Sequence, residues 1–207
     1  MLDRVPFRHY LTVALRVAGG REALEVRRVS FEQQAMVHFA AYWPATPQPH
    51  RLSAGRVDEL PFWFRVLEFR RERTWCYATV GMSDGQPDGI EAFIITPDQN
   101  LRAVEFLHVL THYHLTGARL GLGHTVNFGM ELWDGSGLDH GFLSFPYPEA
   151  NGFDAFDGDN GRTTVAWLVP ITSTEREYKR ANGVEALETL FERRRLNYLD
   201  PSRPSLV

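Results

Sequence analysis

The chain has 207 residues, of which 43% are hydrophobic and 13% aromatic, so it can build a sizeable core and is not an intrinsically disordered chain. Its 22 lysines and arginines and 26 aspartates and glutamates give a net charge of −4, without the basic excess typical of a nucleic-acid-binding protein. The single cysteine, Cys76, excludes an intrachain disulfide, so we expect a reducing compartment, the cytoplasm.

The N-terminal segment has only part of the pattern of a signal peptide. Arg4 and Arg8 precede an apolar run over residues 10–18, but Arg16 interrupts that run and no clean cleavage site follows. No stretch approaches 18 uninterrupted apolar residues, which a membrane-spanning helix needs. We therefore expect no contact with a membrane.

The first predicted strands follow a loop that is rich in proline and small polar residues, at residues 44–55. Residues 62–70 and 73–81 are rich in aromatic and β-branched side chains, and the charged turn between them predicts a β-hairpin. Another strand is expected at residues 90–95. The sequence leaves the role of the first 60 residues open.

The strongest local signal is a helix start at Thr96-Pro97-Asp98-Gln99. Thr96 can cap the helix, Gln99 completes a capping box, and Pro97 suits the first helical position. We expect this helix to continue to about Leu115 and to end at Gly117. Its buried face is predicted from helical spacing as Ala103, Val104, Leu107, Leu110, Thr111 and His114.

The second half of the chain alternates loops and strands before a pair of helices. Glycine-rich or turn-rich loops are expected at residues 121–129 and 151–161, and a short strand at residues 141–145. The almost entirely apolar run at residues 163–171 predicts a central strand.

The C-terminal helices are predicted from a second capping box, Thr172 with Glu175. The first helix should reach about Ala181, where Asn182-Gly183 breaks it. A second should then run to about Arg195 and bury one face, made of Val184, Leu187, Leu190 and Phe191.

Together these elements predict an α+β fold over one domain, residues 1–207, with its body at residues 61–207. A mixed or antiparallel sheet should carry a central helix and a C-terminal helix pair.

Histidines are the first candidates for chemistry. On a helix, His112 and His114 point about 200° apart, whereas zinc on a helix prefers histidines four residues apart. We therefore predict that His114 packs in the core, that His112 faces solvent and that no metal is bound. A metal-dependent hydrolase that uses His112, His114, His124 and His140 is the alternative.

Two other patterns match known sites incompletely. Gly121 and Gly123 follow a helix, whereas a phosphate-binding loop precedes one. Ser136, Asp139 and His140 are the residue types of a hydrolase triad, but no G-x-S-x-G turn surrounds the serine.

The acidic run near residue 157 and the cysteine also have structural explanations. Asp154, Asp157 and Asp159 resemble a calcium loop, but no glutamate closes it, so we expect a turn. Cys76 lies in a predicted strand and is expected to act as a small buried hydrophobic residue. We therefore predict no catalytic residue and no cofactor.

Three blocks of sequence together resemble the suppressor-of-fused domain family, over roughly residues 60–207. The first is RTWCYATVGMSD at residues 73–84. The second is the helix at residues 104–115 that leads into Gly123-His124-Thr125. The third is WLVPITSTEREYKRANGVEALETLFE at residues 167–192, followed by the tail Asp200-Pro201-Ser202-Arg203-Pro204.

The resemblance implies a protein-binding domain. Animal members have a second domain and hold an extended peptide of a transcription factor between the two, so that two-domain clamp is not expected in this chain. Bacterial single-domain relatives are similar to immunity proteins that neutralise toxins, and the negative charge would suit a basic toxin. An oligomeric module joined through an exposed strand edge is a further alternative, and the sequence leaves the oligomeric state open.

The resemblance also implies site residues. In the family the peptide-binding groove uses a tyrosine that matches Tyr77, whose other interpretation is a core aromatic residue. It also uses an acidic residue after the Gly-x-Ser turn, which is Asp84 or Asp88. Gly123, His124 and Thr125 match a structural signature, in which His124 would hold a turn.

Overall fold

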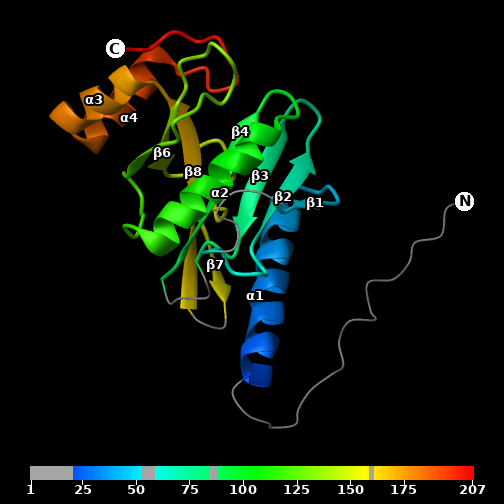
Figure 1. Ribbon diagram of the computed structural model, residues 1–207. Helices are drawn as coiled ribbons and strands as arrows, with labels where there is room; N and C mark the ends of the chain where they lie inside the picture. Colours follow the sequence, from blue (N-terminus) through cyan, green and yellow to red (C-terminus); the bar gives the residue numbers. More distant parts are fainter. Residues whose placement is uncertain (1–20, 53–58, 84–87, 159–160) are drawn as a thin grey trace, which may run out of the picture.

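The computed structural model shows one mixed sheet with helices on both faces (Figure 1). It describes residues 21–52, 59–83, 88–158 and 161–207, and only the backbone of residues 21–30. The strand order is β1-β2-β3-β4-β8-β6-β5, and β7 pairs with β8 beside this path.

The strands confirm the predicted hairpin and the predicted central strand. β2 pairs antiparallel with β3, and β8 lies between β4 and β6. β4 and β8 run parallel, whereas the other neighbouring strands run antiparallel. The strands are β1 (Gln48–His50), β2 (Arg65–Arg70), β3 (Trp75–Val80), β4 (Ile90–Thr96), β5 (Thr125–Asn127), β6 (His140–Ser144), β7 (Ala155–Gly158) and β8 (Gly161–Ile171).

The helices divide between the two faces of the sheet. The central helix α2 (Leu101–Thr116) packs over β2, β3 and β4 on one face (Figure 1). The N-terminal helix α1 (Arg21–Tyr42) and the C-terminal pair α3 (Ser173–Asn182) and α4 (Val184–Arg194) pack on the opposite face. This arrangement confirms the predicted α+β architecture.

Each face of the sheet has its own hydrophobic core, because side chains alternate along a strand. In β3, Cys76 and Ala78 join the core beneath α1 and α4, whereas Tyr77 joins the core beneath α2. The α1 side is aromatic at its centre, where the ring of Phe153 lies 4.9 Å from that of Trp43 and 5.0 Å from that of Phe93.

The core beneath α2 is mainly aliphatic, and the predicted buried face of α2 is confirmed at every position. All six predicted residues are buried, and Phe106 and His108 are buried as well. Phe106 stacks on Phe128 with ring centroids 3.9 Å apart.

The predicted start of the central helix was wrong. Thr96 still belongs to β4, where it pairs with Trp75, and its hydroxyl donates to the Asp98 carbonyl at 2.6 Å. The actual N-cap is Asn100, whose side chain accepts the Arg102 N–H at 3.0 Å. Because Thr96 is still held in the sheet, the chain turns before the helix begins. The predicted end at Gly117 is confirmed.

Three elements lie where loops or no structure had been predicted. The expected loop at residues 44–55 contains β1, and the expected loop at residues 151–161 contains β7. The first 60 residues include α1, and Phe39 of α1 and Trp43, which directly follows it, are fully buried in the core on that side of the sheet. The short strands β1 and β7 form because they pair with β2 and β8, and local sequence does not reveal such pairing.

The C-terminal helices agree with prediction. The Thr172–Glu175 capping box is present in both directions, and Gly183 separates α3 from α4. Of the predicted face of α4, Leu187 and Phe191 are buried, and Val184 and Leu190 pack partly buried against the same core.

Candidate functional site

Tyr77 lies fully buried beneath α2 and takes part in a polar network near the start of that helix. Its hydroxyl accepts the Asn100 backbone N–H at 2.8 Å. Burial, chiefly, raises the pKa of this phenol to about 12. Nearby, the buried Glu68 contacts His50 at 3.0 Å and accepts from the Gln99 side chain at 2.9 Å. The tyrosine therefore supports the sheet and the helix start from within, and its role in partner binding stays a prediction.

The Gly-Met-Ser turn after β3 is held by a buried carboxylate that the sequence analysis missed. Glu91 is fully buried in β4 and accepts five hydrogen bonds. The donors are the backbone N–H groups of Gly81, Met82 and Ser83 and the hydroxyls of Thr79 and Ser83. Burial raises the pKa of the Glu91 carboxyl, and these donors oppose that shift. An acidic residue inside an otherwise apolar strand is the signal that could have revealed it.

The turn leads into the loop that carries the two candidate acidic residues. Gly81 has φ +105°, and a Cβ there would come within 2.7 Å of the Trp63 ring, so glycine is required. Asp88 is exposed and has φ +53°. Asp84 lies outside the described residues. The structure places Asp88 in solvent and Tyr77 in the core, so it does not bring their side chains to one surface.

The Gly123-His124-Thr125 segment forms a turn after the central helix. Gly123 N–H donates to the Leu143 carbonyl at 2.7 Å, and His124 Nδ1 accepts the Gly121 N–H at 3.1 Å. Gly123 has φ +85°, and a Cβ there would lie 3.0 Å from Val184 of α4. His124 therefore holds a turn that lies against the C-terminal helix.

The candidate histidines make hydrogen bonds to different parts of the chain and do not converge on one site. His114 is buried, as predicted, and its Nδ1 accepts the Leu120 N–H at 2.9 Å. His112 is partly exposed and bonds to Glu59 at 2.5 Å. Within the described part of the chain, no three His, Cys, Asp or Glu side chains are placed to hold one metal ion. This geometry gives the hydrolase alternative no support.

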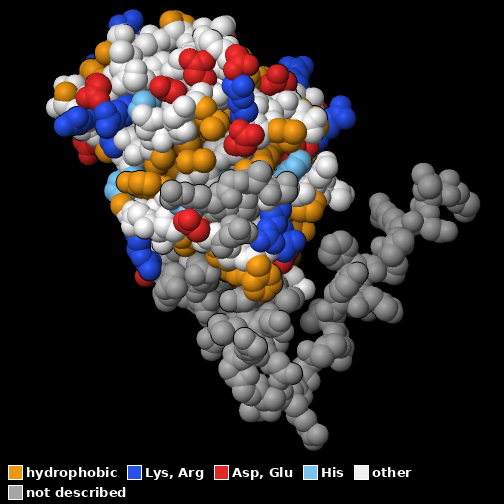
Figure 2. All heavy atoms as spheres, in the orientation of Figure 1, with side chains coloured by type: hydrophobic (Ala, Val, Ile, Leu, Met, Phe, Trp, Pro, Cys, Tyr) orange, Lys and Arg blue, Asp and Glu red, His pale blue; other side chains and the backbone are white. Residues whose placement is uncertain are grey.

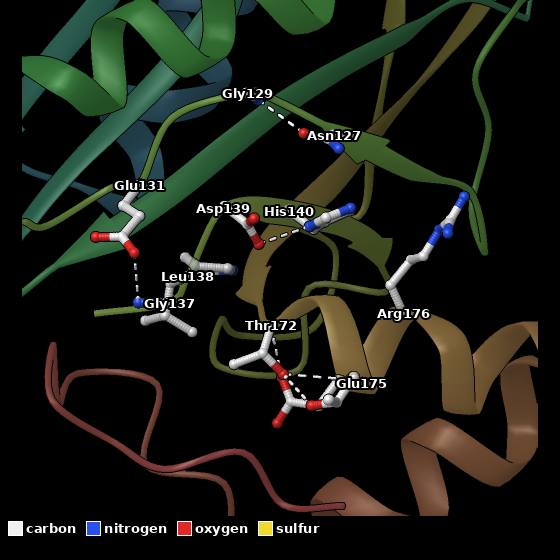
Figure 3. Close-up of polar contacts among 12 residues, drawn as sticks. Asn127, Gly129, Glu131, Gly137, Leu138, Asp139, His140, Thr172, Glu175 and Arg176 are labelled. Atoms are coloured by element: carbon white, nitrogen blue, oxygen red, sulfur yellow. Dashed lines mark hydrogen bonds and ion pairs between the residues drawn. The ribbon is translucent and has the colours of Figure 1, made fainter. Parts of the chain in front are cut away.

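The candidate serine triad does not assemble either. His140 Nδ1 and the Asp139 carboxylate lie 2.7 Å apart, as neighbours in sequence (Figure 3). The Ser136 hydroxyl accepts the Leu138 N–H at 3.1 Å. Glu131 turns back into the same loop and accepts the Gly137 N–H at 3.1 Å. These polar groups hold the loop before β6.

The acidic run near residue 157 and Cys76 also have structural roles. Ala155–Gly158 forms β7 instead of a calcium loop, and Asp154 pairs with Arg162 at 3.7 Å. Asp159 lies outside the described residues. Cys76 is fully buried, as predicted, and burial raises the pKa of its thiol to about 12.

A groove of about 830 Å³ lies between α4 and the sheet, a size within the range of ligand-binding clefts. Trp167 and Phe191 form its floor, and the Tyr198 ring stands edge-on to Trp167 at 5.0 Å. Glu188, on the α4 side, accepts from the Ser144 hydroxyl at 2.8 Å. No single stretch of sequence predicts this groove, because its walls come from four separate segments of the chain.

A buried ion pair, which local sequence did not reveal, connects the tail to α3 and β8. Arg203 donates to both carboxylate oxygens of Glu175, at 2.7 and 2.8 Å, and to the Pro170 carbonyl at 2.9 Å. Burial alone would raise the pKa of Glu175, but the hydrogen bonds and charge of Arg203 outweigh it and hold that pKa below its usual value. The pair fastens the chain after α4, which carries Leu196 and Tyr198, to the sheet.

The face drawn in Figure 2 shows no large patch of one charge sign among the described side chains. Acidic and basic side chains are mixed over the face that carries α2 (Figure 2). Among the described helices, none is long and apolar enough to cross a membrane.

Comparison with known proteins identifies relatives of this fold. A family model described as Suppressor of fused protein (SUFU) matches residues 63–204. The crystal structure of a protein described as a SUFU homologue from Neisseria gonorrhoeae is 31% identical, with a TM-score of 0.76. The match covers 86% of this chain and 98% of that one.

Two more distant structures share the fold. The Sufu–Fu complex is 13% identical with a TM-score of 0.62, and the match covers 79% of this chain and 84% of that one. Drosophila Suppressor of Fused is 12% identical with a TM-score of 0.68, and the match covers 86% of this chain but 51% of the fly protein. No curated protein sequence matches the chain.

Proposed function

The chain belongs to the suppressor-of-fused family, and we propose that it is a non-enzymatic domain that binds a protein partner. The observation that carries this proposal is the turn held by Glu91. Five hydrogen bonds fix the point where the loop after β3 leaves the sheet, and the loop ends at the exposed Asp88. A rigid turn that leads toward an exposed acidic residue, Asp88, suits recognition of a partner, because less conformational entropy is lost on binding.

We propose Asp84 and Asp88 as contacts and Tyr77 as a positioning residue. Tyr77 supports the start of α2 through the Asn100 N–H, so a change there would act on the surface indirectly. In the most specific form of the proposal, the chain is an immunity protein that neutralises a basic toxin in the cytoplasm. The net charge of −4 favours such a partner by long-range attraction.

The first test is to pass the tagged chain through lysate of its own organism and to identify co-purifying proteins by mass spectrometry. We expect one stoichiometric partner. The variant Asp84→Asn/Asp88→Asn should weaken its binding about ten-fold, because the two proposed charge contacts would be lost. Asp157→Asn, at the exposed position of β7, is the control and should have no effect.

A different outcome would redirect the proposal. If a partner binds wild type, Asp84→Asn/Asp88→Asn and Tyr77→Phe equally well, these residues do not form the contact surface. The protein-binding function would still stand. Stoichiometric zinc or manganese that is lost on changing His112 or His140 would instead support the hydrolase alternative.

A further inference from the structure

We propose that the α4 groove is a second interaction site, which binds an extended segment of a partner protein with alternating basic and apolar side chains. The groove lies on the face of the sheet opposite α2, so it is separate from the Glu91-held loop. Four properties support this occupant: an apolar floor, an exposed aromatic rim, a line of carboxylates and the length of that line.

The rim of the groove exposes aromatic surface, and its floor is aromatic but largely buried. Trp167 and Phe191 lie at its base, and the Tyr147 side chain at its rim is 64% exposed. Tyr147 contacts Phe145, itself 42% exposed, with ring centroids 5.2 Å apart. Exposed aromatic residues beside an apolar hollow are typical of surfaces that bind other chains.

The α4 wall is acidic. Glu185, Glu188 and Glu192 all line the groove, and their spacing of three and four residues places them on one side of the helix. Glu185 lies in the first turn, where a negative charge favours the helix, whereas like charges at this spacing repel one another slightly. Arg195 adds one positive charge at the end of the line, which leaves the wall negative.

The length of the acidic line favours a peptide over a compact cation. From Glu185 to Glu192 the helix rises about 10 Å, at roughly 1.5 Å per residue. In an extended peptide, every second side chain points the same way and repeats at roughly 6.6 Å. Three alternate basic residues therefore span about 13 Å and can meet all three glutamates, while the intervening apolar residues face Trp167 and Phe191.

The test uses a fluorescent seven-residue peptide, Ser-Lys-Leu-Lys-Phe-Lys-Ser, and fluorescence anisotropy with the full chain. We expect a Kd in the range of tens of micromolar, roughly that of a short peptide with few ordered contacts. Glu188→Gln/Glu192→Gln should weaken binding about ten-fold and flatten its salt dependence, because exposed ion pairs are lost. Gln can still accept from Ser144, so the wall keeps its shape.

Two matched controls isolate the groove. Glu105→Gln/Glu177→Gln removes the same charge from α2 and α3 and should leave the affinity unchanged. A peptide in which serines replace the leucine and phenylalanine should bind at least ten-fold more weakly. Equal binding by the wild type and Glu188→Gln/Glu192→Gln, or equal binding of a peptide with glutamates in place of lysines, would overturn the proposal.

A second copy of the chain is the competing occupant of the groove. If sedimentation shows a dimer that Glu188→Gln/Glu192→Gln dissociates, a second copy of the chain fills the groove and the peptide proposal is wrong. The outcome is independent of the function proposed above. A Glu188→Gln/Glu192→Gln chain that still captures its partner through Asp84 and Asp88 would leave that function intact.

Discussion

On the face covered by α2, buried polar groups are satisfied by the chain itself. The Tyr77 hydroxyl accepts from Asn100, and His108 lies between the Val104 carbonyl at 2.8 Å and the Leu52 N–H at 3.3 Å. Thr111 donates to the Leu107 carbonyl at 2.7 Å. Each of these groups has a fixed partner within the chain, so these buried groups stabilise the fold and are not available to another molecule.

The opposite face differs from one end to the other. Beneath α1 it is densely packed with aromatic rings, but beside α4 it opens into a groove in which Glu185 and Glu192 are exposed. Polar groups that a fold satisfies internally stabilise it, whereas charged groups left over an apolar hollow are available to a partner. Variants on each face of the sheet test this division.

The aromatic core beneath α1 should be the most sensitive region. Phe153 is fully buried and its ring contacts those of Phe39, Trp43 and Phe93. Phe153→Ala should lower the free energy of unfolding by about 4 kcal/mol, because it leaves a large cavity. Thermal and urea unfolding would measure the change. Phe145→Ala, at an exposed position, should cost less than about 1 kcal/mol. Similar losses for both variants would contradict the packing described.

The buried Glu175–Arg203 pair should give the second-largest loss of stability. Arg203→Met leaves the Glu175 carboxylate buried without its cation, so we expect a loss of about 3 kcal/mol in urea unfolding. Glu175→Gln/Arg203→Met removes both charges and should be less destabilised than Arg203→Met alone. Additive losses would mean that the two side chains stabilise the tail independently.

Acid should destabilise the fold through buried histidines on both sides of the sheet. Burial lowers the pKa of His38, His108 and His114, so the folded chain favours their neutral forms. Their contribution is complete above the unfolded pKa of about 6.5 and is lost as the pH falls toward the lower folded values, by up to about 1.4 kcal/mol per pH unit for each group.

The α2 face provides the variant for this measurement. His108 Nε2 accepts from Leu52, so protonation there breaks that hydrogen bond. Urea unfolding of wild type and His108→Gln between pH 7 and pH 5.5 should show a shallower loss of stability in the variant. Equal slopes would assign the acid sensitivity to other groups.

The acidic wall of the groove should matter least for stability. Glu188→Gln/Glu192→Gln should change the free energy of unfolding by no more than about 0.5 kcal/mol, because Glu192 is exposed and a glutamine at position 188 can still accept from Ser144. A thermal melt of this variant also validates the peptide experiment. A loss above about 2 kcal/mol would mean that these carboxylates stabilise the fold. The two faces would then not differ in whether their polar groups contribute to stability.

The sequence predicted the elements whose signals are local. Alternation and aromatic content located β2 and β3, the apolar run located β8, and the Thr172–Glu175 box located α3. The start of α2 was misplaced because Thr96 is a good capping residue that strand pairing keeps in β4. Local propensity favoured a helix start at Thr96, but strand pairing keeps Thr96 in β4, and the helix is capped at Asn100 instead.

The candidate site was less predictable than the fold. Tyr77 and the Gly123-His124-Thr125 turn were identified by resemblance, but burial of the tyrosine required knowing that α2 covers it. Glu91 and Arg203 were missed because each acts on residues brought near by folding. The groove has walls from β6, β8, α4 and the tail, so no single stretch of sequence contains it.

The parallel pairing of β4 with β8 has a consequence for how the chain is made. Strand β8 enters between β4 and β6, and the segment that separates it from β4 includes α2, β5, β6 and β7. During synthesis, the hairpin of β2 and β3 can form early, but the open edge of β4 must wait until the ribosome has released β8. A nascent chain with an unpaired apolar edge is prone to aggregate, so this delay is the stage at which a chaperone would be most useful.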